Sequence, residues 1–108
     1  MTEIYKNDTI TIYSGLMKNN NVYSGSFFIS NNTNSQLSQV ELNLFVKKHI
    51  SCSVHATSGK DLGPNASLGI RKDVTMTNND PNKKVVFKME IKYIKDGNNV
   101  SESKVITL

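Results

Sequence analysis

The side chains that could do covalent or metal chemistry are few in this chain and lie apart in the sequence. Nucleophilic catalysis needs a serine or cysteine within reach of a base and an orienting acid, and nothing in the sequence assembles such a set around Cys52, His49 or His55. Cys52 has the inward phase of a small core residue, and a histidine without further ligands is more often structural than metal-binding. The Gly59-Lys60 pair lacks the remaining residues of a phosphate-binding loop. We expect no enzyme, no cofactor and no metal site.

The other candidates would act by binding a partner. Apolar and cationic side chains alternate with core residues in two stretches, so they share what should be an outward sheet face. Apolar spots ringed by cations can seat an aromatic anchor and an acidic flank of a peptide. Phe45, the one large aromatic side chain in this set, could equally well be covered by a neighbouring strand or loop. The candidate residues are Phe45, Lys47, Val86, Lys88 and Lys92.

The longest unbroken alternation runs from Lys83 to Lys95, and it positions most of these candidates. A period of two places successive side chains on opposite sides of a pleated strand, one row in the core and the other in water. We therefore expect a half-buried antiparallel strand. Its inward row is Val85, Phe87, Met89, Ile91 and Tyr93, and its outward row is Val86, Lys88, Glu90 and Lys92.

Shorter alternating stretches, separated by turn-forming residues, supply partners for that strand. Asparagine-rich runs and the Asp96-Gly97 pair favour turns, and no window favours an amphipathic helix. Glu3–Lys6 is interpreted as a lead-in. The predicted main strands are Thr9–Met17, Val22–Ser30, Gln36–Lys48, Ile50–Thr57, Ala66–Thr77, Lys83–Lys95 and Val100–Leu108.

About seven strands joined by short polar loops predict an all-β fold, an immunoglobulin-like antiparallel β-sandwich. The chain has no tryptophan and a single cysteine, which argues against a true immunoglobulin domain. Ile50, Cys52 and Val54 should point inward from their strand. In Ala66–Thr77 the apolar face begins at Leu68 and is interrupted at Lys72, so an edge position or a bulge is expected there.

Length and composition bound the class of protein. The 108 residues suit one domain, 1–108, with a single core. A hydrophobic share of 37% and a mean hydropathy of −0.38 are those of a soluble domain, with no membrane insertion expected. The beginning of the chain lacks the features of a signal peptide, which favours the cytosol. A net charge of +4 favours acidic partners in general, whereas nucleic-acid binding would require clustered basic residues among exposed aromatics, so we expect none.

Four Asn-x-Ser/Thr sequons leave an alternative open, that of a secreted or surface immunoglobulin-like adhesion or structural domain. In a chain so rich in asparagine and serine such sequons also arise by chance. They are centred on Asn7, Asn31, Asn65 and Asn99.

Several segments resemble the appendage (ear) domains of clathrin adaptors. The opening IYKNDTITIYSGL and the segment FFISNNTNSQL resemble parts of the alpha-adaptin appendage, and KMEIKYIKDGNNVSESKVITL is similar to its last hairpin and final strand. NDPNKKVVFKMEIKY is similar to the Asn-Pro turn and basic strand of gamma-adaptin ears and of the Golgi-localised gamma-ear adaptors. The resemblance covers nearly the whole chain.

The resemblance implies a single adaptin-ear-like domain, a noncatalytic module that recruits accessory proteins through short acidic and aromatic peptide motifs in vesicle trafficking and endocytosis. It implies a cytoplasmic protein, peripheral on clathrin-coated membranes, that meets other adaptor subunits through parts outside this chain. In gamma-type ears the peptide lies on basic side chains of one strand, beside apolar residues of its neighbour. Those positions fall on Val86, Lys88 and Glu90, of which only Lys88 keeps the charge, so Glu90 joins the candidate site.

Overall fold

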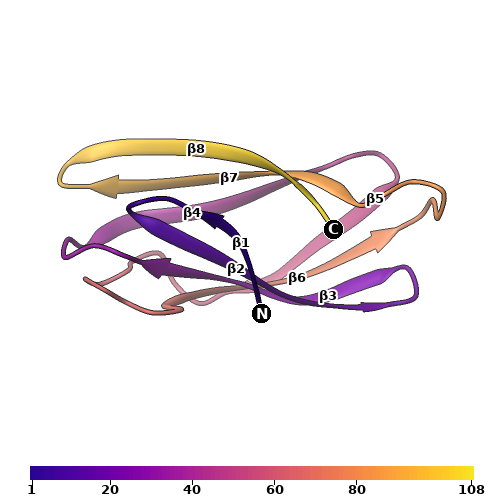
Figure 1. Ribbon diagram of the computed structural model, residues 1–108, viewed down its shortest axis with the longest axis horizontal. Helices are drawn as coiled ribbons and strands as arrows, with labels where there is room; N and C mark the ends of the chain where they lie inside the picture. The colour runs from indigo at the N-terminus through magenta and orange to yellow at the C-terminus, as the bar shows by residue number, and fades with distance from the viewer.

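The computed structural model describes residues 1–108 as an immunoglobulin-like β-sandwich of eight strands (Figure 1). The chain contains no helix, and hence none that could span a membrane. The strands are β1 (Thr2–Lys6), β2 (Ile10–Asn19), β3 (Val22–Asn31), β4 (Leu37–Val46), β5 (Ile50–Thr57), β6 (Ile70–Asn78), β7 (Val86–Lys95) and β8 (Asn98–Thr107).

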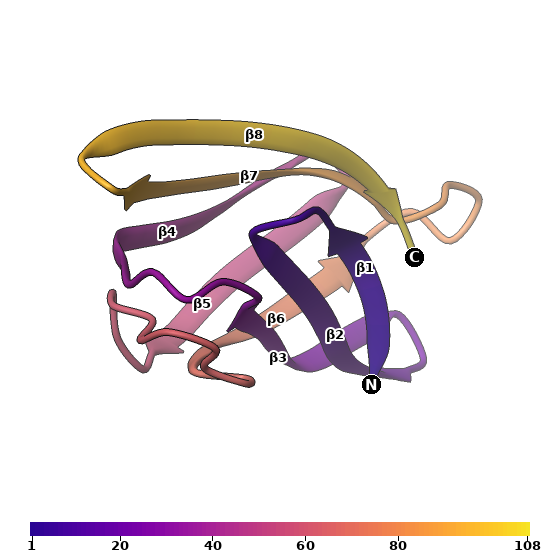
Figure 2. The same cartoon turned by 60° about the vertical axis from the view of Figure 1, so that its left-hand side comes forward.

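The strands form two antiparallel sheets that lie one over the other (Figure 2). The larger sheet has the order β1-β2-β3-β6-β5, and the smaller has the order β4-β7-β8. The chain therefore passes between the sheets at the β3–β4, β4–β5 and β6–β7 connections. The last two of these lie together at one end of a molecule 44 Å long (Figure 1).

The core lies between the sheets and is formed by the inward rows of both. Strand β7 and the residue before it supply the row predicted from the alternation: Val85, Phe87, Met89, Ile91 and Tyr93 are each at most 3% exposed. From the opposite sheet, Phe27 meets Phe87 edge-to-face with ring centroids 5.9 Å apart, a favourable aromatic geometry. The β7–β8 turn was also predicted correctly, because Asp96 and Gly97 both have positive φ (50° and 79°), as a tight hairpin requires.

Each open side of the sandwich is bridged by a polar group. On one side, the Tyr5 hydroxyl on β1 donates a hydrogen bond to the Glu102 carboxylate on β8, and the Asn7 side-chain amide donates to the same carboxylate at 2.7 Å. On the other side, the Lys72 ammonium on β6 donates to the main-chain carbonyl of Leu42 on β4. These bridges give partners to polar atoms that would otherwise lie at the rim of an apolar core.

Four expectations about these elements were wrong. Glu3–Lys6 lies in a paired strand, β1, and is not merely a lead-in. Strand β6 is not at an edge, because it pairs with both β3 and β5, and Lys72 points inward without ending it. Leu68 lies outside the strand, with a φ of 51°. Val54 is 50% exposed, because β5 is the outermost of five strands and the three-stranded sheet is too narrow to cover it.

Two methionines, one buried and one exposed, allow the contribution of core burial to stability to be measured. We expect Met89→Ala to lower the free energy of unfolding by about 2 to 5 kcal/mol, since it leaves a cavity at a position that is 1% exposed. Met17→Ala removes the same atoms where 77% of the residue is exposed and should cost less than about 0.5 kcal/mol. Urea unfolding of both variants measures this. Equal losses would contradict the placement of β7 at the centre of the core.

Lys72 should make stability depend on pH in the alkaline range. Burial lowers its pKa below 10.5, although Cys52 and Glu41 nearby favour its charged form. Between the folded-state pKa and 10.5 the unfolded chain binds more protons than the native one, so the free energy of unfolding rises with pH there. In a Cys52→Ala background, which removes the thiol titration, the chain with Lys72 should gain stability relative to Lys72→Met as the pH rises toward 10.5. Parallel stability curves from urea unfolding would refute this.

Candidate functional site

The outer face of the three-stranded sheet carries a row of two apolar side chains with a cation between them. Lys88, on the central strand β7, pairs with Phe45 of β4 on one side and with Val105 of β8 on the other. Phe45 is 52% exposed and Val105 62% exposed, and the Lys88 Nζ lies 5.8 Å from the centre of the Phe45 ring. We call Phe45, Lys88 and Val105 the apolar row. A cation over an aromatic ring at this distance is attracted by the ring face.

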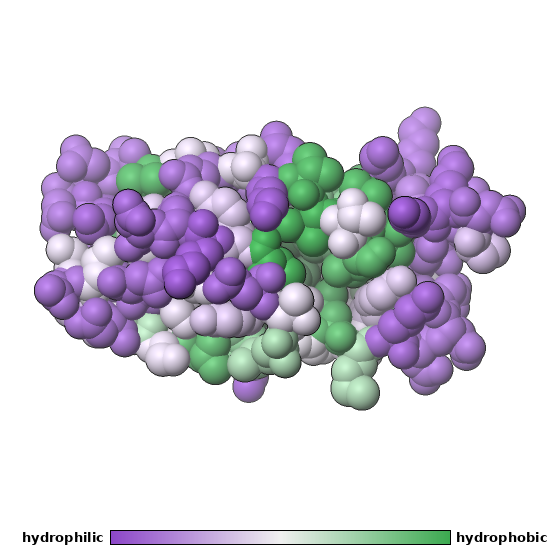
Figure 3. Space-filling model, viewed as in Figure 1, coloured by the Kyte–Doolittle hydropathy of each residue, from purple (hydrophilic) through white to green (hydrophobic).

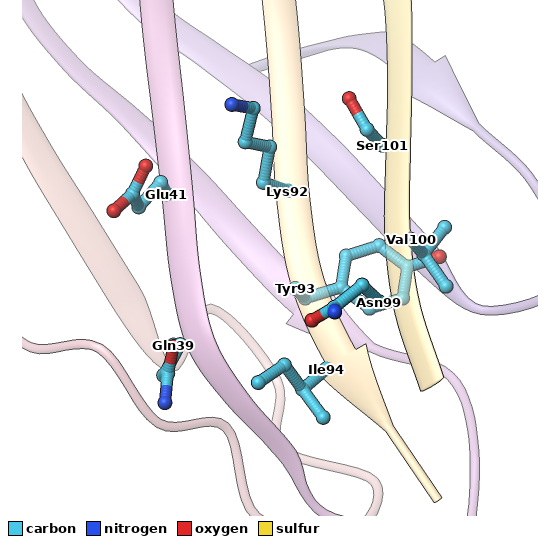
Figure 4. A pocket seen from close by; sticks show the side chains of 8 residues that line it. All are labelled: Gln39, Glu41, Lys92, Tyr93, Ile94, Asn99, Val100 and Ser101. Atoms are coloured by element: carbon cyan, nitrogen blue, oxygen red, sulfur yellow. The ribbon is translucent and has the colours of Figure 1, made fainter. Parts of the chain in front are cut away.

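Toward the carboxyl end of β7 the charges on this face largely cancel. The Lys92 ammonium lies 3.7 Å from the Glu90 carboxylate and pairs across the strands with Glu41. The Asn43 side chain also donates to Glu90, at 3.2 Å. Figure 4 shows Glu41 and Lys92 projecting beside a shallow pocket of about 390 Å³, which Gln39, Ile94, Asn99 and Ser101 also line.

Toward the amino end of β7 the same face continues into a hollow that is lined almost entirely by basic residues. It measures about 670 Å³ and lies between the β4–β5 and β6–β7 connections. Four of the 13 lysines and arginines of the chain line it. Its single ion pair is a long one, 4.0 Å between Lys83 and Asp80. We call this hollow the basic depression; its residues are Lys47, Lys48, His49, Lys83, Lys84 and Val86.

Hydrogen bonds hold the two loops of the basic depression together. The His49 ring donates from Nε2 to the Lys84 carbonyl at 3.0 Å, and the Asn79 main-chain amide donates to the His49 carbonyl at 2.8 Å. The Asn78 side chain donates to the Lys83 carbonyl at 2.9 Å. The lysine backbones are thus fixed in position while their side chains are exposed.

The structure places all the candidate residues from the sequence on one face, divided into three parts. Phe45 and Lys88 belong to the apolar row, Lys47 and Val86 line the basic depression, and Glu90 and Lys92 form the neutral end. Sequence reasoning missed Val105, although its phase in β8 puts it outward. It also missed Lys48, Lys83 and Lys84 as candidate binding residues. Their signal was the presence of two adjacent-lysine pairs, each beside a predicted turn.

The residues first considered for chemistry lie apart from this face. His55 bonds the Thr75 hydroxyl at 2.8 Å, and no three His, Cys, Asp or Glu side chains gather where they could hold a metal ion. Cys52 is half-buried against the core. Burial raises the pKa of its thiol, and the nearby Lys72 ammonium partly offsets that rise.

Comparisons with known proteins agree on one kind of domain. A family model described as the adaptin C-terminal domain matches residues 1–107. The fold is similar to the GAE domain of GGA2p from Saccharomyces cerevisiae, with a TM-score of 0.88 and 23% identity over 99% of this chain and 94% of that one. It is also similar to the yeast GGA1 GAE domain, with a TM-score of 0.90 and 20% identity over 98% of this chain and 96% of that one. No curated protein matches the chain by sequence.

Cys52 should be a slow nucleophile in the native protein. Thiol reagents attack the thiolate, whose population falls when burial raises the pKa. We expect labelling of native Cys52 to be at least about tenfold slower than labelling of the urea-unfolded chain. Lys72→Met, which removes the one nearby cation, should slow it further. A native rate equal to the unfolded rate would contradict this.

Proposed function

The chain belongs to the family of adaptin C-terminal domains, the appendages of clathrin adaptors, and we propose that it recruits accessory proteins by binding short peptide motifs on the outer face of its three-stranded sheet. In this proposal the domain is a noncatalytic module. Its partners are trafficking or endocytic proteins that carry acidic and aromatic motifs. Its place is the cytoplasmic side of clathrin-coated membranes, with other adaptor subunits held by parts outside this chain.

The apolar row is the observation that carries the proposal. Two large apolar side chains more than half exposed on one face, with no neighbouring element over them, retain contact area for a partner. Lys88 between them can pair with a carboxylate next to the partner's anchor. An aromatic or bulky apolar side chain laid across Phe45 and Val105, with an acidic neighbour at Lys88, uses all three residues.

The affinity of such a site is expected to be modest. A short peptide becomes ordered on binding and covers little area, which limits the dissociation constant to about 1 to 100 μM, or roughly −8 to −5.5 kcal/mol. A coat that displays many copies of an appendage multiplies weak contacts into a strong one. Micromolar binding therefore suits the proposed role.

Two of the four sequons fit the alternative of a glycosylated surface domain poorly. Asn31 is 2% exposed, and its side-chain amide donates to the carbonyls of Ser35 at 2.8 Å and Gly63 at 2.9 Å. The Asn7 amide is likewise engaged by Glu102. A glycan on Asn31 would have to displace those bonds, so this sequon has a structural reason to exist.

The proposed face is tested by titration calorimetry against peptides of Trp-x-x-Phe, Asp-Pro-Phe and Phe-Gly-x-Phe type with acidic flanks. Phe45→Ala should weaken binding about tenfold through lost apolar contact. Lys88→Glu should weaken the acidic-flanked peptides by a similar factor, and more at low salt than at high salt.

Lys60→Glu is the matched control for Lys88→Glu, because Lys60 is also an exposed lysine and lies in the β5–β6 loop, outside the apolar row and the basic depression. It should leave the affinity within about twofold. The proposed face is wrong if no peptide binds below about 1 mM, or if binding survives the loss of both Phe45 and Lys88.

A further inference from the structure

The charges on the outer face of the small sheet are distributed unequally along its strands. At the Lys92 end, Glu41 and Glu90 face a single ammonium. At the other end, four lysines meet only Asp80, at 4.0 Å. Lys47, Lys48 and Lys84 take part in no ion pair. An acidic segment lying along this face would be attracted to one end and not to the other.

The basic depression is continuous with the apolar row. Val86, the single apolar residue that lines the depression, stands two positions before Lys88 on the outward face of β7. Two strand residues span about 7 Å. A peptide anchored on the apolar row therefore reaches the depression with a residue about two to four positions from its anchor, since an extended chain advances about 3.3 Å per residue.

The loops that carry the lysines are held in place before any ligand arrives. The His49–Lys84 and Asn79–His49 hydrogen bonds join the β4–β5 and β6–β7 connections, and the Ile50 amide closes the first of them by donating to the Lys47 carbonyl at 2.9 Å. Backbone already ordered in the free protein does not have to be ordered on binding, so more of the charge attraction appears as affinity.

We propose that the basic depression binds the acidic flank of the same peptide whose anchor occupies the apolar row. This deepens the proposed function and rests on it. It assigns recognition of carboxylates to Lys47, Lys48, Lys83 and Lys84, and it places the acidic residues about two to four positions from the anchor, on the side that faces the β4–β5 and β6–β7 loops. The Lys92 end contributes little to this preference.

The shape of the site favours a peptide over a membrane surface as the occupant. The lysines line a hollow of about 670 Å³, and Val86 is its single apolar lining residue. Side-chain carboxylates on an extended chain can enter such a hollow, and the chain arrives already aligned by the strand beside it. In the view of Figure 3, mainly hydrophilic side chains cover this end of the molecule.

The experiment compares three forms of one peptide with the same aromatic anchor: four Asp before the anchor, four Asp after it, and Asn in place of every Asp. The proteins are the wild type, the double variant Lys48→Glu/Lys84→Glu, and the control Lys6→Glu/Lys60→Glu. The control makes the same change of net charge at exposed positions outside the depression. Thermal unfolding checks that all three are folded.

We expect the wild type to bind one of the two Asp peptides about tenfold more tightly than the Asn peptide at low salt. The Lys48→Glu/Lys84→Glu variant should lose most of that preference, of which only the contribution of Lys88 remains. It should keep its affinity for the Asn peptide within about twofold, because its apolar row is intact. The control and Lys92→Glu should keep the preference.

A preference that is undiminished in Lys48→Glu/Lys84→Glu overturns the inference while leaving peptide binding at the apolar row in place. The inference also fails, and the apolar row remains the binding site, if the wild type shows no acidic preference and Phe45→Ala abolishes all peptide binding. Failure of the wild type to bind any form overturns both proposals. The same proteins are also mixed with phosphatidylcholine vesicles containing phosphatidylserine. If the double variant loses vesicle binding but keeps the peptide preference, the depression is a membrane contact and the inference is wrong.

Discussion

The central position of β7 in a three-stranded sheet is the constraint on which the rest of the structure depends. It is the one strand of that sheet with a neighbour on both sides, so its inward row closes the core over Phe27 while its outward row is the middle of the exposed face. A change of register by one residue would turn Lys88 into the core and Met89 out to the exposed face, so the core and the face would be lost together. The same ten residues therefore specify both the central row of the core and the middle of the candidate face.

The local part of this arrangement could be predicted from the sequence. Alternation fixes which β7 residues are buried, and Asp96-Gly97 fixes the hairpin that follows, because both signals act between residues close in the chain. At the start of β4, Gln39 has a positive φ and the pairing shifts, so that Leu37 and Val40 are both buried although they are three residues apart. A bulge changes the phase without leaving a clear mark on the residue types.

The long-range part could not be predicted, because it depends on the order of strands in each sheet. Lys72 indicated an edge strand, yet β6 lies between β3 and β5, and the lysine is accommodated by a carbonyl from the other sheet. Val54 is exposed because it lies on the edge strand of the five-stranded sheet, where the three-stranded sheet is too narrow to cover it. The basic depression is of the same kind: Lys47-Lys48 and Lys83-Lys84 are distant in sequence and meet because both connections cross between the sheets at one end.

The division of the face into an apolar row and a basic depression has a consequence for how tightly and how fast a ligand could be held. Lys88 already rests over Phe45 in the free protein, an exposed contact worth about 0.5 to 1 kcal/mol. A peptide anchor that replaces this contact gains only the difference, and Lys88 can turn to a carboxylate at little cost because both side chains are exposed. The row therefore supplies position more than strength. Of the four lysines of the depression, only Lys83 has an ion-pair partner to give up, at 4.0 Å, so charge attraction there adds to the affinity and to the rate of encounter. Salt screens that addition, whereas the apolar contact persists, so ionic strength would alter how strongly acidic flanks are preferred without moving the anchor from its place.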